Sequence, residues 1–258
     1  MNREPDGAAG RAVKLSAAVI TKNEEKKIGD CLDSLSFADE IVVVDCGSTD
    51  RTTEIAKSKG AKVVFHEWEG HIGQKNYAIS QTTGEWILSL DADERVSARL
   101  RVEIQRALLD PRADGYAIAR LVFYINRWIY HCGWYPARKV RLFKRGKGKW
   151  TGENPHDKIE LKGRLQNLDG DIYHLSFDTI SDHLKTINSF TQIAARERTA
   201  KNHKAGFFSI ALRPPATFMK MYFLKLGFLD GIPGLILSGL SSYHVFCKYL
   251  KISQMSRE

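Results

Sequence analysis

Short apolar runs alternate with amphipathic stretches along the first third of the chain. Each run has the length of a buried strand, and between the runs the apolar positions recur with helical spacing. This alternation predicts right-handed strand–helix–strand crossovers, and therefore an α/β fold with a mainly parallel sheet flanked by helices. The expected strands are Leu15–Thr21, Ile41–Val44, Ala61–Phe65 and Glu85–Leu90, and the expected helices are Glu24–Leu35, Thr52–Lys59 and His71–Gln81.

Acidic residues directly follow two of these strands. Asp45 follows the second strand, and Asp91 and Asp93 follow the fourth. Ligands of such sheets bind beyond the C-terminal strand ends, so we expect these carboxylates and residues 21–24 to share one crevice. Positions i and i+2 of an extended segment point to the same side, so Asp91 and Asp93 could hold one hard divalent cation. The alternative is a loop with two solvated aspartates before a helix that begins at Ser97.

Length and composition limit what these carboxylates could serve. With 258 residues, 43% of them hydrophobic, the chain can bury the core of one large domain or of a domain plus an appendage. Met1–Arg11 contains no apolar run typical of a signal peptide, so we do not expect export. The four cysteines have neither metal-ligand nor redox-pair spacing, which favours structural thiols in a reducing compartment.

The positive charge is concentrated near the C-terminus. Of the formal net charge of +9, residues 185–258 contribute 11 Lys and Arg against 3 Asp and Glu, and the first 184 residues are nearly neutral. The basic residues thus lie in the segment that is richest in aromatic and aliphatic side chains. This combination favours an anionic membrane surface over nucleic acid as the partner.

Several motifs follow one another in an order that is specific to one family. In the first half they are ITKNEE (Ile20–Glu25), VVVDCGSTDRT (Val42–Thr52), GQKNYA (Gly73–Ala78) and LSLDADER (Leu88–Arg95). This series resembles the family 2 glycosyltransferases, which have the GT-A fold. The second half resembles the lipopolysaccharide inner-core enzymes that add glucose to a heptose, through GWYPARKVRLFKRGKGKW (Gly133–Trp150), NPHDKI (Asn154–Ile159), DIYHLSF (Asp171–Phe177) and FLKLGFLDGIPGL (Phe223–Leu235).

The resemblance implies a UDP-sugar donor and a set of residues around it. Asp45 would accept the N3–H group of uracil, and Lys75 would face the ribose or the diphosphate. Each has a plainer interpretation, because Asp45 could cap a turn and Lys75 could be a solvated surface charge. The residues assigned to the nucleotide by resemblance are Thr21, Asn23, Glu24, Asp45, Lys75, Asn76, Asp91 and Ala92.

In this family the Asp91-Ala92-Asp93 motif holds Mn²⁺ or Mg²⁺ on the diphosphate. The resemblance makes Asp93 the direct ligand and brings Asp91 to the ribose or to a metal-bound water, while His174 could complete the coordination. The ion would neutralise the charge that develops on UDP as the glycosidic bond breaks. The alternative for His174 is a core histidine beside Tyr173.

Family 2 enzymes generally invert the anomeric carbon in one displacement, which needs a base for the acceptor proton. The motif NPHDKI indicates Asp157 as this base, although the enzymes that it resembles have His followed by Glu there. Glu153 is the second candidate.

A basic segment lies between these motifs. Its functional interpretation is a clamp on phosphate, on the donor or on a phosphorylated heptose, with Arg138 and Arg141 assigned to the nucleotide sugar. The basic residues of the segment are Arg138, Lys139, Arg141, Lys144 and Arg145. The alternative is a strand, Lys139–Lys144, that alternates exposed charges with buried apolar residues. Both interpretations are compatible with each other.

We expect a catalytic domain over residues 12–180 and a helical region over residues 181–258. Lysines interrupt the apolar C-terminal segments too often for a membrane-spanning helix, which needs about 20 apolar residues. These segments are therefore interpreted as helices that lie in an anionic membrane interface. The alternative is a helical pair packed on the catalytic domain or across a homo-oligomer.

Taken together, the sequence predicts an inverting, metal-dependent transferase that moves a hexose, with glucose preferred, from UDP to an inner-core heptose. The expected location is the cytoplasmic face of the bacterial inner membrane. Another cell-surface glycan or a protein acceptor is an alternative. More distant alternatives are a phosphohydrolase of the haloacid dehalogenase type, which also has an Asp-x-Asp after a strand, and a non-catalytic adaptor.

Overall fold

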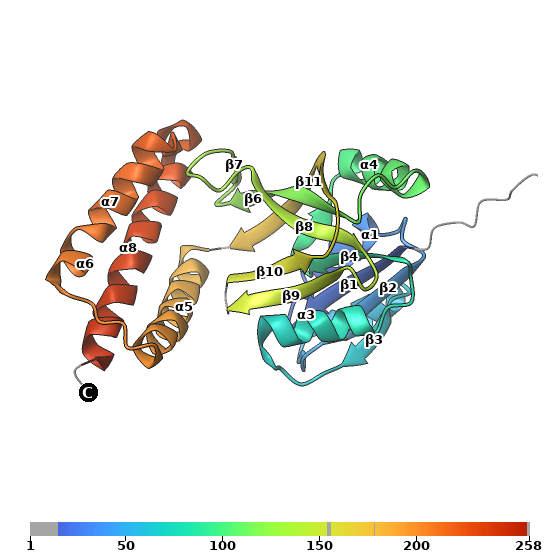
Figure 1. Cartoon of the computed structure of the whole chain (residues 1–258), viewed down its shortest axis with the longest axis horizontal. Coiled ribbons are helices and arrows are strands. Elements are labelled where there is room, and N and C mark those ends of the chain that lie inside the picture. The colour runs from blue at the N-terminus through green and yellow to red at the C-terminus, as the bar shows by residue number, and fades with distance from the viewer. Residues whose placement is uncertain (1–14, 154–155, 178, 257–258) are drawn as a thin grey trace, which may run out of the picture.

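A nine-stranded mixed sheet forms the centre of the molecule (Figure 1). The computed structural model describes residues 15–153, 156–177 and 179–256, without the side chains of Glu153 and His156. The strand order is β3-β2-β1-β4-β8-β6-β11-β5, and β7 pairs with β6. The strands are β1 (Leu15–Thr21), β2 (Glu40–Asp45), β3 (Lys62–Phe65), β4 (Trp86–Asp91), β5 (Glu94–Val96), β6 (Gly115–Tyr124), β7 (Arg127–Ile129), β8 (Ala137–Lys144) and β11 (Leu165–Phe177).

The N-terminal half of the sheet is parallel, as its alternating pattern predicts. Strand β1 pairs in parallel with β2 and β4, and β2 pairs in parallel with β3. All seven residues of β1 are buried, because helices and a hairpin cover both faces of the sheet around it. The connecting helices are α1 (Ile28–Ser34), α2 (Thr52–Ser58) and α3 (Gly70–Ser80).

The two faces of the sheet have separate cores. On one face, alternate residues of β1 pack with apolar side chains of α1 and of α4 (Ala98–Leu109). On the other face, the intervening residues of β1 pack with α3 and with the hairpin of β9 (Gly148–Glu153) and β10 (His156–Leu161). The hairpin is important for the site because it carries Asp157.

The second half of the sheet mixes directions. Strand β8 runs antiparallel to both β4 and β6, whereas β11 pairs in parallel with β6 and antiparallel with β5. A strand is expected at Lys139–Lys144, and β8 contains it, but its charged residues are not uniformly exposed: Arg141 is 2% exposed. The predicted α/β class of the GT-A type, with a mainly parallel sheet and a helical C-terminal region, is confirmed.

Helices make up the C-terminal region, which lies to one side of the sheet (Figure 1). Helix α8 packs against α5 through Ala195, Tyr249 and Ile252, and its Leu237 reaches the end of the sheet at Tyr124 and Ile129. The helices are α5 (Ile180–Ala200), α6 (Phe207–Ala211), α7 (Arg213–Met219), the π-helix η1 (Lys220–Leu224), the 3₁₀-helix η2 (Gly227–Asp230) and α8 (Gly231–Met255).

Buried Asp230 joins these helices to the sheet. Its carboxylate accepts hydrogen bonds from the backbone N–H groups of Tyr130 and His131, at 3.3 and 2.8 Å, and it lies 2.9 Å from Nδ1 of His131. In the described part of the chain no single helix is long and apolar enough to cross a membrane. The segments Phe207–Leu224 and Gly227–Met255 meet the length and composition criteria only as a pair, which is bent by 71°.

Candidate active site

A pocket of about 870 Å³ opens where β1 and β4 end. Its lining includes Thr21 and Glu24 at and after the end of β1, Asp91 to Asp93 at and after the end of β4, and Asp157 of the β9–β10 hairpin. Helices α5 and α8 line the opposite side through Thr186, Phe190 and His244, among others. The expected location beyond the C-terminal strand ends is thus occupied by a pocket large enough for a small-molecule ligand.

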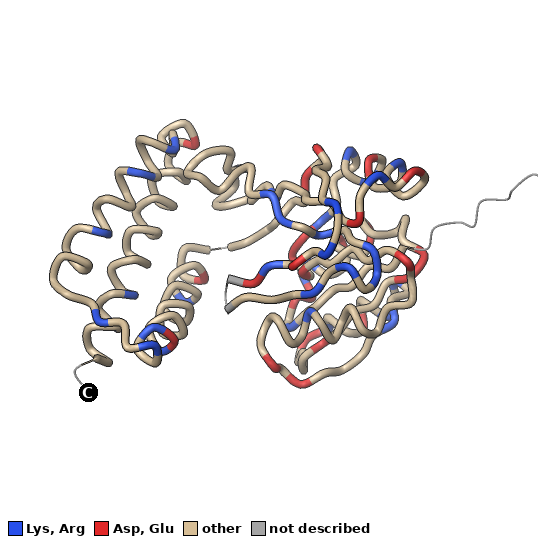
Figure 2. The backbone as a smooth tube through the Cα atoms, viewed as in Figure 1, with Lys and Arg blue, Asp and Glu red and all other residues tan. Residues whose placement is uncertain are grey.

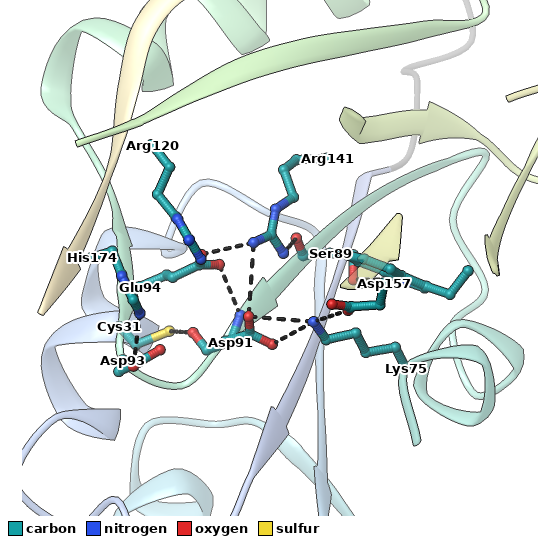
Figure 3. Close-up of polar contacts among 11 residues, drawn as sticks. Cys31, Lys75, Ser89, Asp91, Asp93, Glu94, Arg120, Arg141, Asp157 and His174 are labelled. Atoms are coloured by element: carbon teal, nitrogen blue, oxygen red, sulfur yellow. Dashed lines mark hydrogen bonds and ion pairs between the residues drawn. The ribbon is translucent and has the colours of Figure 1, made fainter. Parts of the chain in front are cut away.

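Asp91 faces two cations in this pocket (Figure 3). Its carboxylate lies 3.1 Å from Nζ of Lys75 on α3 and 3.7 Å from the guanidinium of Arg141 on β8. Burial opposes ionisation of Asp91, but these two charges outweigh it and hold its pKa well below the ordinary value. Asp91 is therefore a carboxylate whose charge is fixed by its neighbours.

Lys75 also holds Asp157. Its Nζ lies 2.7 Å from Oδ2 of Asp157 and 4.2 Å from the centre of the Trp150 ring. Burial would raise the pKa of Asp157, yet Lys75 lowers it overall. The lysine is only 5% exposed, so it is part of the site and not the solvated surface charge that the sequence left open.

Glu94 is a buried residue of the site that sequence reasoning missed. Its carboxylate accepts a 2.7 Å hydrogen bond from Nη2 of Arg141 and a 3.0 Å bond from the backbone N–H of Asp91, and Arg120 is 3.6 Å away. It fixes the arginine that faces Asp91. Its position in LSLDADER, directly after Asp93, was the feature of the sequence that could have indicated its role in the site.

Asp91 and Asp93 turn in different directions. Strand β4 ends at Asp91, and Ala92 and Asp93 form the turn into β5, so the extended geometry assumed for the pair does not continue. Both residues line the pocket, and their convergence on one cation stays a prediction. Asp93 lies 3.0 Å from Nε2 of His174 on β11 (Figure 3).

His174 is a pocket residue that is paired with an acidic side chain. Two buried polar atoms here make no hydrogen bond: Oδ1 of Asp91, despite its ion pair with Lys75, and Nδ1 of His174. Carboxylate oxygens suit Mn²⁺ or Mg²⁺, and a neutral imidazole nitrogen is a common metal ligand. Among the described residues, however, no three His, Cys, Asp or Glu side chains are grouped closely enough to hold a metal ion unaided.

Asp45 caps its own turn. Its Oδ2 accepts hydrogen bonds from the backbone N–H groups of Gly47 and Ser48, both at 2.9 Å, and the Ser48 hydroxyl donates to Oδ1. Asn23 is bound to the same loop through Thr49, whose N–H donates to Oδ1 of Asn23 at 2.8 Å. Neither residue lines the pocket, whereas Thr21 and Glu24 do, and the assignment of Asp45 to uracil stays a prediction.

Two further predicted residues point elsewhere. The Asn76 amide pairs with both backbone groups of Trp150, at 2.9 and 3.0 Å, and so ties α3 to the hairpin. Arg138, near the start of β8, donates a hydrogen bond to the backbone carbonyl of Leu168 on β11. Neither lines the pocket. The side chain of Glu153, the second candidate base, lies outside the described residues, as do Asn154 and Pro155 of the NPHDKI motif that carries Asp157.

The pocket also contains basic residues that the sequence did not single out for the site, namely His71, Arg120 and His183 of α5. Lys139, from the predicted basic segment, lines it as well. Burial, with nearby Arg141 and Arg120, lowers the pKa of Lys139, and burial beside His244 lowers the pKa of His183 to about 4. His183 is therefore neutral at physiological pH and accepts or donates one hydrogen bond with the Tyr124 hydroxyl, 2.8 Å away.

Comparison with known proteins identifies the family of this chain. Residues 16–161 match the model of the glycosyl transferase family 2, which is more than half of the chain. The chain therefore belongs to glycosyltransferase family 2, as its motifs predicted, and it is a transferase. The phosphohydrolase and adaptor alternatives are wrong.

Relatives of similar length share this assignment. An uncharacterised glycosyltransferase of Rickettsia typhi is 30% identical, over 94% of this chain and 88% of its own length. The lipopolysaccharide core biosynthesis glycosyltransferase LpsC of Rhizobium meliloti is 29% identical, over 93% of this chain and 92% of its own length.

Solved structures support the fold. TarS of Staphylococcus aureus (residues 1–349), determined in complex with UDP-GlcNAc, superposes with a TM-score of 0.51 at 16% identity and 92% coverage of both chains. The mannosyltransferase PcManGT of Pyrobaculum calidifontis, determined with GDP-Man and Mn²⁺, has a TM-score of 0.50 at 16% identity, covering 94% of this chain and 86% of its own.

Proposed function

We propose that this chain transfers a hexose, with glucose as the first candidate, from a UDP-sugar to a heptose of the lipopolysaccharide inner core. Its similarity to LpsC along nearly the whole of both chains supports this acceptor class. TarS and PcManGT, which share the fold, were solved with nucleotide sugars, so this donor class is the first to test. The basic and apolar C-terminal region supports the cytoplasmic face of the bacterial inner membrane as the location.

The observation that carries the proposal is the pairing of Asp91 and Asp157 through Lys75 on the pocket wall. A carboxylate base must lie beside the reacting carbon, and a cation must lie beside the departing phosphate. Lys75 and Arg141 provide positive charge next to Asp91, where a diphosphate would bind. Asp157, from a separate hairpin, faces the same space from the other side of Lys75.

The proposed reaction is a single displacement with inversion. The acceptor hydroxyl oxygen forms a bond to the anomeric carbon while the bond from that carbon to the diphosphate oxygen breaks. Asp157 takes the hydroxyl proton, and UDP leaves with the electron pair of the broken bond. Asp157 is ionised at neutral pH, because Lys75 lowers its pKa below the ordinary acidic value, and an ionised carboxylate is the form that can accept a proton.

Asp91, Asp93 and His174 are the residues that would hold a divalent cation. Such an ion would supply a Lewis acid that neutralises charge on the leaving diphosphate. Mg²⁺-type sites commonly combine one or two carboxylates with oxygens of a substrate phosphate. Among the described residues no three side chains form a metal-ligand group, so phosphate oxygens of the substrate would have to supply the remaining ligands.

The acceptor has a plausible place on the helical side of the pocket. Trp134 follows β7, and Phe190 belongs to α5; both line this side together with Thr186. Aromatic faces pack well on the apolar faces of sugar rings, and hydroxyl groups provide hydrogen bonds that fix orientation. The sheet would thus bind the donor, and the helices would complete the acceptor site.

A donor and acceptor screen tests the proposal. Purified protein with Mn²⁺ is incubated with UDP-glucose, UDP-galactose, UDP-GlcNAc or GDP-mannose and a deacylated inner-core oligosaccharide that ends in heptose. We expect one hexose to be added from a UDP-sugar, with inverted anomeric configuration in the product NMR spectrum. Transfer to a different glycan or to a protein only, or retention of configuration, would contradict the proposal.

A further inference from the structure

The bent segment of residues 207–235, which we call the apolar bend, exposes an unusual amount of apolar surface. Eleven large apolar side chains in these 29 residues are at least 44% exposed, whereas described residues 15–206 contain eight that are exposed. Leu224 is 78% exposed, and Phe207 and Phe208 are 77% and 75% exposed. Soluble monomers rarely expose apolar groups in such density without a partner.

The turn between η1 and η2 forms the tip of the apolar bend. The chain reverses at Leu226, whose φ of 54° lies in the left-handed region that residues other than glycine rarely adopt. Five of the seven residues from Phe223 to Leu229 are exposed large apolar side chains. A strained reversal that presents apolar side chains to solvent indicates a surface adapted for contact.

Charge identifies the partner. Between Lys201 and Ser256 there are seven Lys and Arg residues and one acidic residue, Asp230, which is 1% exposed and bound to His131. Figure 2 shows basic residues in the segment that precedes α6 and along α7 and η1. Two copies of such a surface would repel each other, whereas anionic lipid headgroups would attract it.

We propose that the apolar bend lies in the interface of an anionic membrane, with its exposed Phe and Leu side chains among the acyl chains and its lysines among the headgroups. The bend of 71° and the lysines at positions 220 and 225 favour a segment that lies in the interface over one that spans the bilayer. The proposal is independent of the sugar and of the acceptor.

The same surface is bound directly to the wall of the pocket. The carbonyl of Lys225 accepts a 2.9 Å hydrogen bond from the N–H of Cys132, and Arg127 donates to the carbonyl of Leu229 at 3.1 Å. Residues Gly133 and Trp134, which directly follow Cys132, line the pocket. Docking of the apolar bend would therefore bring this side of the pocket close to the lipid surface.

Vesicle sedimentation of the full chain tests the proposal. The vesicles contain phosphatidylcholine alone or with about 30 mol% phosphatidylglycerol, since anionic lipid provides the electrostatic attraction. We expect the affinity for anionic vesicles to be at least about tenfold higher than the affinity for neutral vesicles. Added salt should weaken the binding to anionic vesicles. Absence of binding to anionic vesicles would overturn the proposal.

Matched double variants separate this surface from general hydrophobicity. Leu212→Ser/Leu224→Ser removes side chains that are 59% and 78% exposed on the bend, and Leu109→Ser/Leu165→Ser removes side chains that are 85% and 48% exposed elsewhere. The first variant loses two anchoring side chains, so its affinity for anionic vesicles should fall by a factor of about ten or more. The second variant should bind like the wild type. Equal binding by both variants would contradict the assignment.

Charge reversal provides a second test that does not depend on the apolar side chains. Lys204→Glu/Lys220→Glu should lose most of the preference for anionic vesicles, whereas Lys57→Glu/Lys147→Glu, at exposed positions of the sheet region, should keep it. Thermal unfolding of each variant confirms folding. A wild-type dimer in analytical ultracentrifugation that Leu212→Ser/Leu224→Ser converts to a monomer would instead identify a second copy as the partner and refute the proposal.

Discussion

Replacement of Lys75 by methionine removes the cation that is shared by two carboxylates. Its Nζ lies 3.1 Å from Asp91 and 2.7 Å from Asp157, and its side chain is only 6% exposed. Removal of one partner from a buried ion pair typically costs about 3 to 5 kcal/mol, because the other charge stays buried without compensation. Asp91 is 26% exposed and keeps Arg141 at 3.7 Å, which reduces the cost.

We therefore expect Lys75→Met to lower the free energy of unfolding by about 3 kcal/mol at neutral pH. For a chain of this size, about 2 to 4 °C per kcal/mol gives a decrease in Tm of about 6 to 12 °C. Calorimetry at pH 7.5 measures the decrease in Tm, and urea unfolding at the same pH measures the decrease in the free energy of unfolding. The matched control is Lys59→Met, which breaks an ion pair of the same 2.7 Å length with Asp33 at the surface, where both side chains are well exposed. The control should change stability by about 0.5 kcal/mol or less.

The pH dependence follows from the same contacts. Asp91 and Asp157 have lowered pKa values in the folded protein, so their ionised forms contribute stability above the pKa of an unfolded aspartate, about 3.9, and lose it as the pH falls further. In Lys75→Met these carboxylates lack their cation and take up protons more readily. The difference from the wild type should thus be largest near pH 7.5 and shrink towards pH 4.5. A difference that is the same at both pH values, or that equals the Lys59→Met control, would refute this reasoning.

Three further predictions concern other residues of the site and its support. Asp157→Asn should reduce transfer about 100-fold to 10,000-fold in a coupled assay for released UDP, while calorimetry shows UDP binding retained; an active variant would end its assignment as the base. His174→Ala should weaken UDP binding in the presence of Mn²⁺ but not in EDTA, because it removes a ligand of the ion; equal loss in both would indicate a structural role. Asp230→Ala should lower the free energy of unfolding by about 2 to 4 kcal/mol in urea, because it leaves two partly buried N–H groups at Tyr130 and His131 without the acceptor that they have in buried Asp230, and a loss below 0.5 kcal/mol would contradict this.

The pattern of apolar and polar residues was sufficient to predict an element's bounds where that pattern agrees with how the element packs. The bounds of β1 were predicted to the residue, since all of its positions are apolar or small and all are buried. Helix α1 was predicted to begin at Glu24 but begins at Ile28. The reason is tertiary: Asn23 has a left-handed φ of 54°, and the backbone of Asn23, Glu24 and Glu25 is bound by side chains of the loop after β2.

Side-chain direction in the site could not be predicted in the same way. The sequence indicated that residues 21–24 and Asp91 share one crevice, because they lie at the C-terminal ends of strands, and the family resemblance assigned Lys75 to the same ligand. It did not reveal that Lys75 bridges Asp91 to Asp157, since α3 and β10 are brought together only by the packing of the hairpin on the sheet. Likewise, Arg141 was read as a phosphate clamp or an exposed charge, whereas it is buried against Glu94.

The balance of charge in the pocket gives a physical reason to expect a cation with the donor. Lys75, Arg141 and Arg120 are already engaged by Asp91, Glu94 and Asp157, so three cations face three carboxylates at close range. A diphosphate that binds beside Asp91 adds further negative charge to the same space, and like charges in a partly buried site are costly. A divalent ion held by Asp91, Asp93 and His174 would offset that charge without removing Lys75 from Asp157. Lys75 could then keep Asp157 ionised while the donor is bound, which is the state in which a base can accept the acceptor's proton.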